Sequence, residues 1–309
     1  LPDFLFDKMN KKYLDNIEES CDAYWESAGY FVYKILKKIL KIVSSLVLVV
    51  SAAILVKILI IDSYISQKTI SEIQELYHHQ DNNNNENETT DEEGNEKNKF
   101  SELLKINPEI CGWISISGTR IDYPVLQGNK NETHFYLEHN YKREKSKYGS
   151  IFLDPICQLS ENPKNCVIYG HHMSDGQMFA DLMKFSSLDF YKQNPLISFE
   201  TIKDKDAKWK IFSVFKTNTL ASQGKIFYYV VSNFADSNSF LDYVSQVRKR
   251  SLLDIPVDVN ENDKLITLST CSYEFQDFRT VIVARRVRDG EDEAVNTSLA
   301  AEAKNPLMP

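Results

Sequence analysis

The sequence contains few of the residues that mark several specialised classes of protein. Among 309 residues there are 10 Gly, 9 Pro and 5 Cys, while hydrophobic residues make up 42% and charged residues 26%. These proportions exclude a collagen-like chain, a wholly disordered chain and a mini-protein held together by disulfides. The length is sufficient for one large domain or two smaller ones, each with a hydrophobic core.

The chain also lacks a surplus of basic residues. It has 36 Lys and Arg against 44 Asp and Glu, so its formal net charge is −8. A protein that binds the phosphate backbone needs a basic surface, so we expect no nucleic-acid partner. The acidity is uneven, because residues 1–33, 81–99 and 289–309 carry −4, −5 and −4, whereas residues 100–288 carry +2.

Several site signatures are missing. The sequence has no Cys-x-x-Cys and no His-Glu-x-x-His, so a zinc site has little support, and we expect no metal. It has no G-x-x-x-x-G-K-[ST], G-x-G-x-x-G or G-x-S-x-G, which removes the usual signatures of nucleotide binding and of a serine nucleophile elbow. We therefore expect no cofactor.

One long apolar run is present at residues 42–61 (IVSSLVLVVSAAILVKILII), with Lys57 as its single charge. As a helix rising about 1.5 Å per residue it is about 30 Å long, which matches the hydrocarbon thickness of a bilayer. A core helix is seldom apolar on every face for so many turns. Lys57 lies near one end, where its stem can reach the headgroups. The run therefore predicts a transmembrane helix.

The charges that flank this run predict its orientation. Four Lys residues lie directly before it, in 34–41 (KILKKILK), and its other flank is acidic. The positive-inside rule therefore predicts a cytoplasmic segment at 1–41 and an extracellular location for everything after Asp62. A cleaved signal peptide fits poorly, because about 40 residues precede the run. We expect a single-pass protein of the cell membrane with its N-terminus in the cytoplasm.

Residues 62–99 are expected to form an extracellular stalk and linker. Residues 63–79 space their Ile and Leu side chains as a short helix would. Residues 81–99 (DNNNNENETTDEEGNEKNK) have no aliphatic or aromatic side chain to bury, which predicts a disordered tether. The acidic residues 289–309 predict a flexible tail.

The body of the chain, residues 100–288, consists of short apolar runs separated by turn signals. The spacing predicts helices at 179–185 and 237–250. Many strands with two interposed helices predict a mainly β fold, either a barrel or a sandwich. The predicted strands are 113–116, 123–126, 150–153, 166–169, 196–199, 209–215, 227–231, 265–270 and 280–287.

The sharpest local feature is KLITLSTCSYEFQDFR, residues 264–279. A strand-like run delivers Cys271 at its end, and Arg279 opens the next strand, which would place the two side by side at a barrel rim. A free Cys is most often a small buried hydrophobe. A thiol of pKa about 8.5 is only a few per cent ionised at neutral pH, so a nucleophilic Cys needs a cation or a base nearby.

The candidate base lies in CVIYGHHMSDGQMF, residues 166–179. There a strand-like run ends at Gly170 and releases His171 and His172 into a polar loop. A lone His is usually a surface residue or a satisfied core residue. A pair at a strand exit, in a chain that also has a Cys at a strand exit, makes a catalytic His a specific hypothesis.

These segments resemble the paired signatures of sortases, the membrane-anchored cysteine transpeptidases of Gram-positive bacteria. TLSTC (267–271) with Arg279 is similar to the nucleophile motif, and YGHHM (169–173) is similar to the histidine motif. The resemblance covers residues 100–288 and implies a sortase catalytic domain with an eight-stranded β-barrel and a few helices, preceded by the one transmembrane helix. Three further segments resemble class B: NPEICGWISISGTRIDYPVLQ (107–127), YGSIFLD (148–154) and DGQMFADLMKF (175–185).

The resemblance also implies roles for individual residues. Cys271 would be the nucleophile, His171 the acid and base, and Arg279 the group that stabilises the oxyanion. Ser269 and Thr270 are candidates for substrate binding. The implied reaction is cleavage of a C-terminal sorting motif after Thr, through a thioester, and transfer to an amine of the peptidoglycan precursor. The partners would be surface proteins that carry the motif, which class membership suggests begins Asn-Pro or Ser/Pro-Pro.

Three alternatives remain open from the sequence: a pilin-polymerising sortase, a hydrolytic cysteine protease and a non-catalytic adhesion module tethered to the membrane. Three further Cys residues also lie after the apolar run. Cys111 and Cys166 have the apolar contexts of buried thiols. A disulfide between Cys157 and Cys166 is compatible with an oxidising location and is not decided by the sequence.

Overall fold

A computed structural model describes residues 2–86, 99–131, 135–272 and 278–308 of the chain. The chain divides into two compact units, Leu1–Tyr64 and Ile65–Pro309. Residues 87–98, the greater part of the predicted disordered tether, lie outside the described residues.

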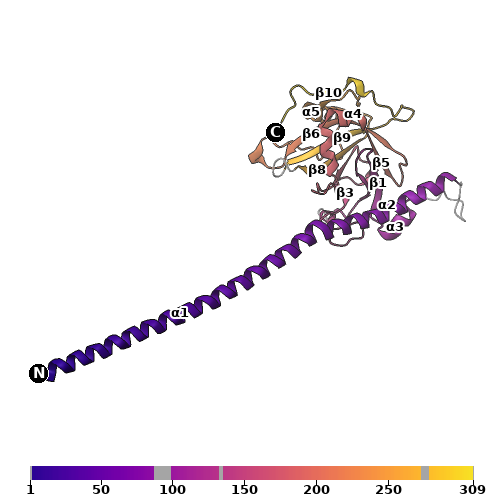
Figure 1. Cartoon of the computed structure of the whole chain (residues 1–309). Coiled ribbons are helices and arrows are strands. Elements are labelled where there is room, and N and C mark those ends of the chain that lie inside the picture. Colours follow the sequence, from indigo (N-terminus) through magenta and orange to yellow (C-terminus); the bar gives the residue numbers. More distant parts are fainter. Residues whose placement is uncertain (1, 87–98, 132–134, 273–277, 309) are drawn as a thin grey trace. The chain divides into compact units, whose positions relative to one another are not determined.

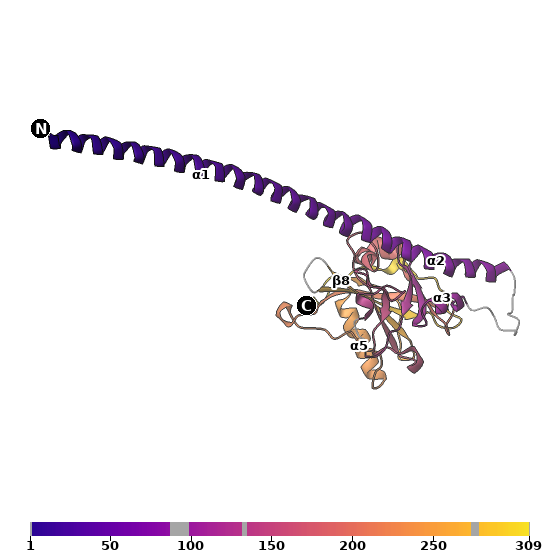
Figure 2. The same cartoon turned by 90° about the horizontal axis from the view of Figure 1, so that it is seen from below.

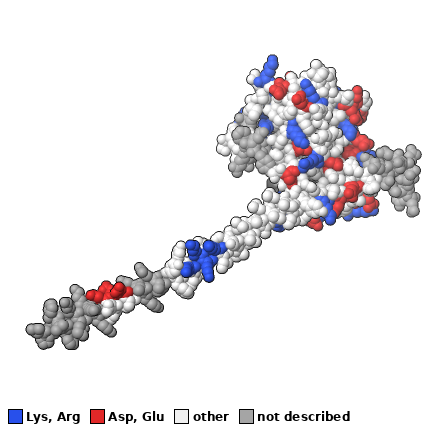
Figure 3. All heavy atoms as spheres, viewed as in Figure 1, with Lys and Arg blue, Asp and Glu red and all other residues white. Residues whose placement is uncertain are grey.

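The first unit is helical. It consists of α1 (Pro2–Val56), the π-helix η1 (Lys57–Ile61) and the start of α2 (Asp62–Glu86). Residues 29–61 are all exposed, and the helix that contains them is the one in the described residues that is long and apolar enough to cross a membrane. The lysines of 34–41 form a cluster on it (Figure 3). In the wide π turn, Lys57 forms an ion pair of 3.0 Å with Asp62.

The second unit contains a closed β-barrel in the order β1-β2-β3-β4-β8-β9-β6-β5 (Figure 1). The β2–β3 and β4–β8 pairs are parallel, and the other pairs are antiparallel. The prediction of an eight-stranded barrel is therefore confirmed. The strands are β1 (Ile110–Ser115), β2 (Asp122–Leu126), β3 (Ile151–Leu153), β4 (Asn165–Tyr169), β5 (Leu196–Thr201), β6 (Lys208–Asn218), β8 (Leu265–Ser272) and β9 (Phe278–Arg286).

Helices and a small second sheet surround the barrel. The α5 helix coincides with the predicted helix 237–250, and it begins at a capping box formed by Asp236 and Ser239. The β7 and β10 strands pair with each other in the second sheet. The remaining elements are α3 (Ser101–Ile106), α4 (Leu188–Gln193), α5 (Ser237–Arg250), β7 (Leu253–Asp254), β10 (Ala301–Glu302) and the 3₁₀ turns η2 (Phe135–Leu137), η3 (Leu159–Glu161), η4 (Ala180–Ser186), η5 (Ala221–Gln223) and η6 (Thr297–Leu299).

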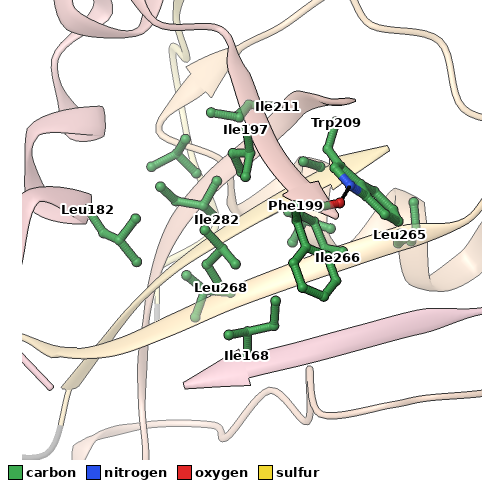
Figure 4. Packing of buried hydrophobic residues seen from close by; sticks show 14 of the residues in the cluster. Ile168, Leu182, Ile197, Phe199, Trp209, Ile211, Leu265, Ile266, Leu268 and Ile282 are labelled. Carbon is green, nitrogen blue, oxygen red and sulfur yellow. Dashed lines mark hydrogen bonds between the residues drawn. The ribbon is translucent and has the colours of Figure 1, made fainter. Parts of the chain in front are cut away.

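The barrel is filled by aliphatic and aromatic side chains, because an eight-stranded barrel has an interior just wide enough for side chains to fill. Ile168 of β4, Leu268 of β8 and Ile282 of β9 are fully buried and lie together in its core (Figure 4). Leu182 of η4 lies in the same cluster. Because these residues belong to strands that carry the candidate catalytic residues, the packing of this core fixes the framework of the candidate site.

The prediction of a strand at 227–231 is wrong. This segment has no ladder partner, and side chains bind its backbone instead. The Tyr243 hydroxyl donates to the carbonyl of Tyr229 (3.1 Å), and the Asn165 amide donates to that of Val231 (2.7 Å). The apolar pattern that suggested a strand belongs to an extended segment that packs against α5.

The structure also differs from the prediction of a stalk and tether at 62–99. The α2 helix covers the predicted helical stretch, but it packs against the barrel beside α3 (Figures 1 and 2). The Tyr77 ring stacks on Trp113 with centroids 4.0 Å apart, and the Tyr77 hydroxyl binds Glu200. Lys99 also pairs with Glu200, at 2.5 Å. Tyr77 of the predicted helical stalk and Lys99, the last residue of the predicted tether, are therefore both held by the barrel.

The prediction of a flexible acidic tail at 289–309 is contradicted by the contacts of this segment. Its β10 strand pairs with β7. Upstream of β10, Glu291 accepts two hydrogen bonds from the fully buried Arg285 (2.6 and 2.7 Å) and one from Lys210 (2.8 Å). The composition suggested a solvated tail because the sequence does not show that two buried cations of the barrel need an anion.

We predict that α2 is required for stability. A chain that starts at residue 65 should unfold at the same temperature as the full chain in detergent, because it keeps the Tyr77–Trp113 stack. A chain that starts at residue 100 should lose about 3–5 kcal/mol, the range for removal of a large buried side chain. Thermal unfolding followed by tryptophan fluorescence measures both. Equal stability of the two shortened chains would contradict the docking of α2.

We predict that Glu291→Gln destabilises the fold by about 3 kcal/mol at pH 7, because it leaves Arg285 buried without its carboxylate. Hydrogen bonds from Arg285 hold the pKa of Glu291 far below its ordinary value of 4.5. The contribution of the ionised Glu291 carboxylate to the free energy of unfolding is therefore complete above pH 4.5 and is lost as the pH falls further. Urea unfolding at pH 7 and at pH 3 should show that the difference from wild type shrinks in acid; a constant difference would refute the assignment.

Candidate active site

Three adjacent strands bring the predicted catalytic residues together. In the antiparallel β8–β9 pair, Cys271 lies directly opposite Arg279. In the parallel β4–β8 pair, each residue from Asn165 to Tyr169 is level with the residue 100 positions later in the chain. His171 follows Tyr169 by two residues, and Cys271 follows Ser269 by two. The backbone register therefore places Cys271 between His171 and Arg279.

Gly170 carries the chain from β4 to His171. Its backbone N–H donates to the carbonyl of Ser269 (3.3 Å), which extends the β4–β8 pairing by one step. A Cβ at this position would lie 2.4 Å from the Ile151 side chain and 2.7 Å from Phe179. Both neighbours are buried. Glycine is therefore the residue that lets the strand approach its neighbours and still release His171 at the barrel rim.

The loop after His171 is held from three sides. The Tyr148 hydroxyl donates to the Asp175 carboxylate (2.7 Å), and Arg120 donates to the Asp175 carbonyl (2.7 Å). The Phe179 N–H returns to the carbonyl of His171 (2.8 Å). These contacts fix the backbone on which the His171 ring is mounted.

The His171 ring is half-buried, and its Nε2 lies 2.7 Å from the carbonyl oxygen of Leu137. Leu137 belongs to the η2 turn, which is 34 residues earlier in the chain. His172 is also half-buried, and it pairs with Met178 in an isolated bridge. The register therefore distinguishes the two histidines as candidates, because His171 is the one that lies level with Cys271 along the strand direction.

The side chains of Ser269 and Thr270 are buried, whereas a role in substrate binding suggests exposed side chains. The Ser269 side chain is fully buried and forms a 2.8 Å hydrogen bond with the Tyr229 hydroxyl. Thr270 is 2% exposed. Both residues lie beside the candidate site, and substrate contact through their side chains stays a prediction. The side chain of Cys271 and residues 273–277 lie outside the described residues.

The other described thiols have the environment of buried structural cysteines. Cys111, Cys157 and Cys166 are free, so Cys157 and Cys166 do not form a disulfide in this structure. Burial raises the pKa of the Cys157 and Cys166 thiols to about 12. These two thiols are therefore almost entirely protonated at neutral pH and are poor nucleophiles.

The arrangement suits nucleophilic acyl transfer. A Cys near the end of its strand, with a His just beyond the end of one neighbouring strand and an Arg on the other, has a proton-transfer group and a cation on either side of it. Among the described residues, no three His, Cys, Asp or Glu side chains gather as metal ligands.

Comparison with known proteins agrees with this geometry. The sortase domain family matches residues 114–287, which is more than half of the chain. The chain belongs to the sortase family. Members of this family are cysteine transpeptidases. Sortase B of Listeria monocytogenes is 39% identical over 196 residues (63% of this chain and 76% of that protein), and sortase B of Staphylococcus aureus is 34% identical over 192 residues (62% and 75%).

Solved structures show the same fold. The Staphylococcus aureus sortase B–substrate complex superimposes with a TM-score of 0.63 at 29% identity, covering 74% of this chain and 99% of that one. Clostridium perfringens sortase B gives 0.55 at 34% identity, covering 60% and 98%. This sortase is therefore a class B enzyme, as the segments at 107–127, 148–154 and 175–185 indicated.

Several residues that shape the site were not singled out from the sequence. Tyr148, Asp175 and Leu137 hold the His171 loop and the ring itself. Tyr148 and Asp175 lie inside segments that resembled class B sortases, so the signal was present without a role attached. Leu137 acts through its backbone carbonyl, and a backbone contact leaves no mark on residue type.

We predict that thiol-reactive probes label one cysteine of residues 100–288 much faster than the others. At pH 8 about 10⁻⁴ of the Cys157 and Cys166 thiols are ionised, given pKa values of about 12. If Cys271 is a nucleophile, it should react with iodoacetamide at least about 100 times faster than either. Mass spectrometry of digested protein gives the rates. Labelling of Cys271 no faster than Cys157 would favour the non-catalytic adhesion module.

Proposed function

We propose that this sortase cleaves a C-terminal sorting motif after Thr, forms a thioester on Cys271 and transfers the bound protein to an amine of the peptidoglycan precursor. The observation that supports this most directly is the register of β4, β8 and β9, in which Cys271 lies opposite Arg279 and His171 follows the end of β4 at the level of Cys271. The family membership supports the reaction class, and the register supports the proposed roles of these three residues.

The first half of the reaction breaks the peptide bond after Thr. The Cys271 thiolate attacks the carbonyl carbon, and the electron pair of the C=O bond moves to oxygen. Arg279 donates hydrogen bonds to this oxyanion, an interaction typically worth about 3–4 kcal/mol in a protein site. The C–N bond then breaks, and the leaving amine takes a proton from the His171 imidazolium. The acyl group remains on Cys271 as a thioester.

The second half forms the new amide. An incoming amine attacks the thioester carbonyl, His171 takes up the proton that the amine loses, and the Cys271 thiolate leaves. The pair of groups thus returns to its starting state, with a thiolate and an imidazolium. No outside reductant or energy source is needed, because one amide bond replaces another through a thioester of intermediate reactivity.

The N-terminal unit supports a location at the cell membrane. We propose that 42–61 spans the bilayer, with 1–41 in the cytoplasm, because the lysines of 34–41 precede the apolar stretch. We further propose that 100–288 forms the extracellular catalytic domain. Residues 65–86 and 289–307 should be counted with this domain, because this part of α2 and the segment around β10 contribute buried contacts to it.

The substrate proposal rests on the relatives. One solved relative is described as a sortase B–substrate complex, so a substrate binds to this fold. We propose that the substrates here are surface proteins with a C-terminal sorting motif that begins Asn-Pro or Ser/Pro-Pro. A pentapeptide library presented to the full chain in detergent would select the motif. The peptide that wild type cleaves fastest then serves as the assay substrate.

We predict that Cys271→Ala abolishes both cleavage of this peptide and amide formation, with a loss of at least about 10⁴-fold, while the unfolding temperature stays within a few degrees of wild type. Cys157→Ala is the matched control and should retain activity, because that thiol is buried and protonated. Activity is measured by chromatography of the peptide products. Cleavage that survives in Cys271→Ala would refute the assignment of the nucleophile.

The acceptor is tested with the same assay. An added peptidoglycan-precursor amine should raise the yield of ligated product, whereas a hydrolytic protease would release the acid regardless of the amine. Incubation with a purified pilin subunit tests the remaining alternative, a pilin-polymerising sortase. Such an enzyme would join the peptide to a Lys of that subunit. Ligation to the precursor amine in preference to pilin is the expected result.

A further inference from the structure

The contact between His171 and Leu137 determines which nitrogen of the ring is protonated. Nε2 lies 2.7 Å from the Leu137 carbonyl oxygen. A carbonyl oxygen can only accept a hydrogen bond, so Nε2 must be the donor. In a neutral imidazole the other nitrogen, Nδ1, then carries the lone pair. The nitrogen that gains and loses a proton is therefore Nδ1, while Nε2 keeps its hydrogen throughout.

The position of this carbonyl depends on how the η2 turn (Phe135–Leu137) is held. The segment that leads into β3 binds the backbone of the turn and of the residues after it. The Ser150 N–H donates to the carbonyl of Tyr136 (2.8 Å), and the Ser146 N–H donates to that of Glu138 (2.7 Å). The Leu137 carbonyl lies between these two fixed points, so it is presented to His171 by a backbone that has little freedom.

Gly149 lies at the closest approach of these two segments. Its φ angle is +59°, a region that favours glycine. A Cβ built on it would lie 2.6 Å from the carbonyl oxygens of both Leu137 and Tyr136. The backbone could not accept such a contact without moving. Of the two oxygens that a methyl group at this position would displace, that of Leu137 is the one that binds His171.

We infer that Gly149 is a positioning residue for the transpeptidase reaction: it admits the Leu137 carbonyl that holds His171 as the Nε2–H tautomer and leaves Nδ1 to exchange protons with the substrate amines. The inference rests on the proposed role of His171 as acid and base. It extends that role by naming the atom that carries the proton and the residue on which its orientation depends.

The contact also separates an effect on positioning from an effect on stability. Displacement of the Leu137 oxygen removes the acceptor that keeps the hydrogen on Nε2, so the neutral His171 ring should then populate the Nδ1–H tautomer as well. Loss of stability alone would reduce the amount of active enzyme without changing the tautomer of the folded fraction.

The experiment compares Gly149→Ala with Gly290→Ala in the full chain in detergent. Gly290 has a similar φ of +76°, and no atom lies within 4 Å of a Cβ built on it, so it controls for backbone strain without a contact. With the pentapeptide that wild type selects from the library, Gly149→Ala should lower kcat/KM at least about tenfold and, by nitrogen-15 NMR, reduce the fraction of His171 rings that carry their hydrogen on Nε2. Gly290→Ala should leave both unchanged.

A second measurement does not depend on the variant. Nitrogen-15 NMR of histidine-labelled wild-type protein, above the pKa of the ring and with His171→Ala for assignment, should show His171 with its hydrogen on Nε2. A neutral wild-type ring protonated on Nδ1, or an unchanged tautomer and kcat/KM in folded Gly149→Ala, overturns the inference. Full activity of His171→Ala is a different outcome, because it refutes the proposed function instead. If Gly149→Ala does not fold, the tautomer of His171 measured by NMR in the wild-type protein tests the inference.

Discussion

The parallel pairing of β4 with β8 is the constraint on which the candidate site depends. Parallel strands share one direction, so their C-terminal ends meet at the same rim of the barrel. Here the pairing runs from Asn165 with Leu265 to Tyr169 with Ser269, and the next residues along the two strands lead to His171 and Cys271. The antiparallel β9 strand then starts at that rim and brings Arg279 opposite Cys271. Two kinds of pairing on one strand thus gather three residues separated by up to 108 positions.

The shell around these residues is built from backbone contacts and close approaches. Gly170 leaves β4 in contact with Ile151 and Phe179, and the carbonyl of Leu137 holds the ring that follows it. Tyr148 and Arg120 reach the loop at Asp175 from separate parts of the chain. Displacing any of these groups would shift His171 relative to β8, because the histidine lies beyond the last ladder pair and has no strand of its own to hold it.

Much of the fold and the site could be predicted from the sequence, and the failures have identifiable physical causes. The α5 helix and the barrel strands follow the periodicity of their side chains, and the TLSTC and YGHHM segments carry the resemblance to sortases. The segment 227–231 has a strand's composition but is held by Tyr243 and Asn165 from outside any ladder. The contacts of α2 and of Glu291 were missed because a long-range partner, such as Trp113 or Arg285, has no signature in the segment that it binds.

The ion cluster at the C-terminal end has a consequence for the order in which the protein can be completed. Arg285 and Lys210 are buried in the barrel wall, and their carboxylate partner, Glu291, is translated after both. Lys210 also donates to the backbone carbonyls of Asp292 and Ala294, whereas Arg285 has a further carboxylate, that of Asp258, 3.8 Å away. A chain that emerges N-terminus first therefore cannot complete the pairing of Lys210 and Arg285 until residues 291–294 have followed the strands that carry the two cations. The neutralisation of this part of the barrel wall is thus completed by a segment that comes after the last barrel strand.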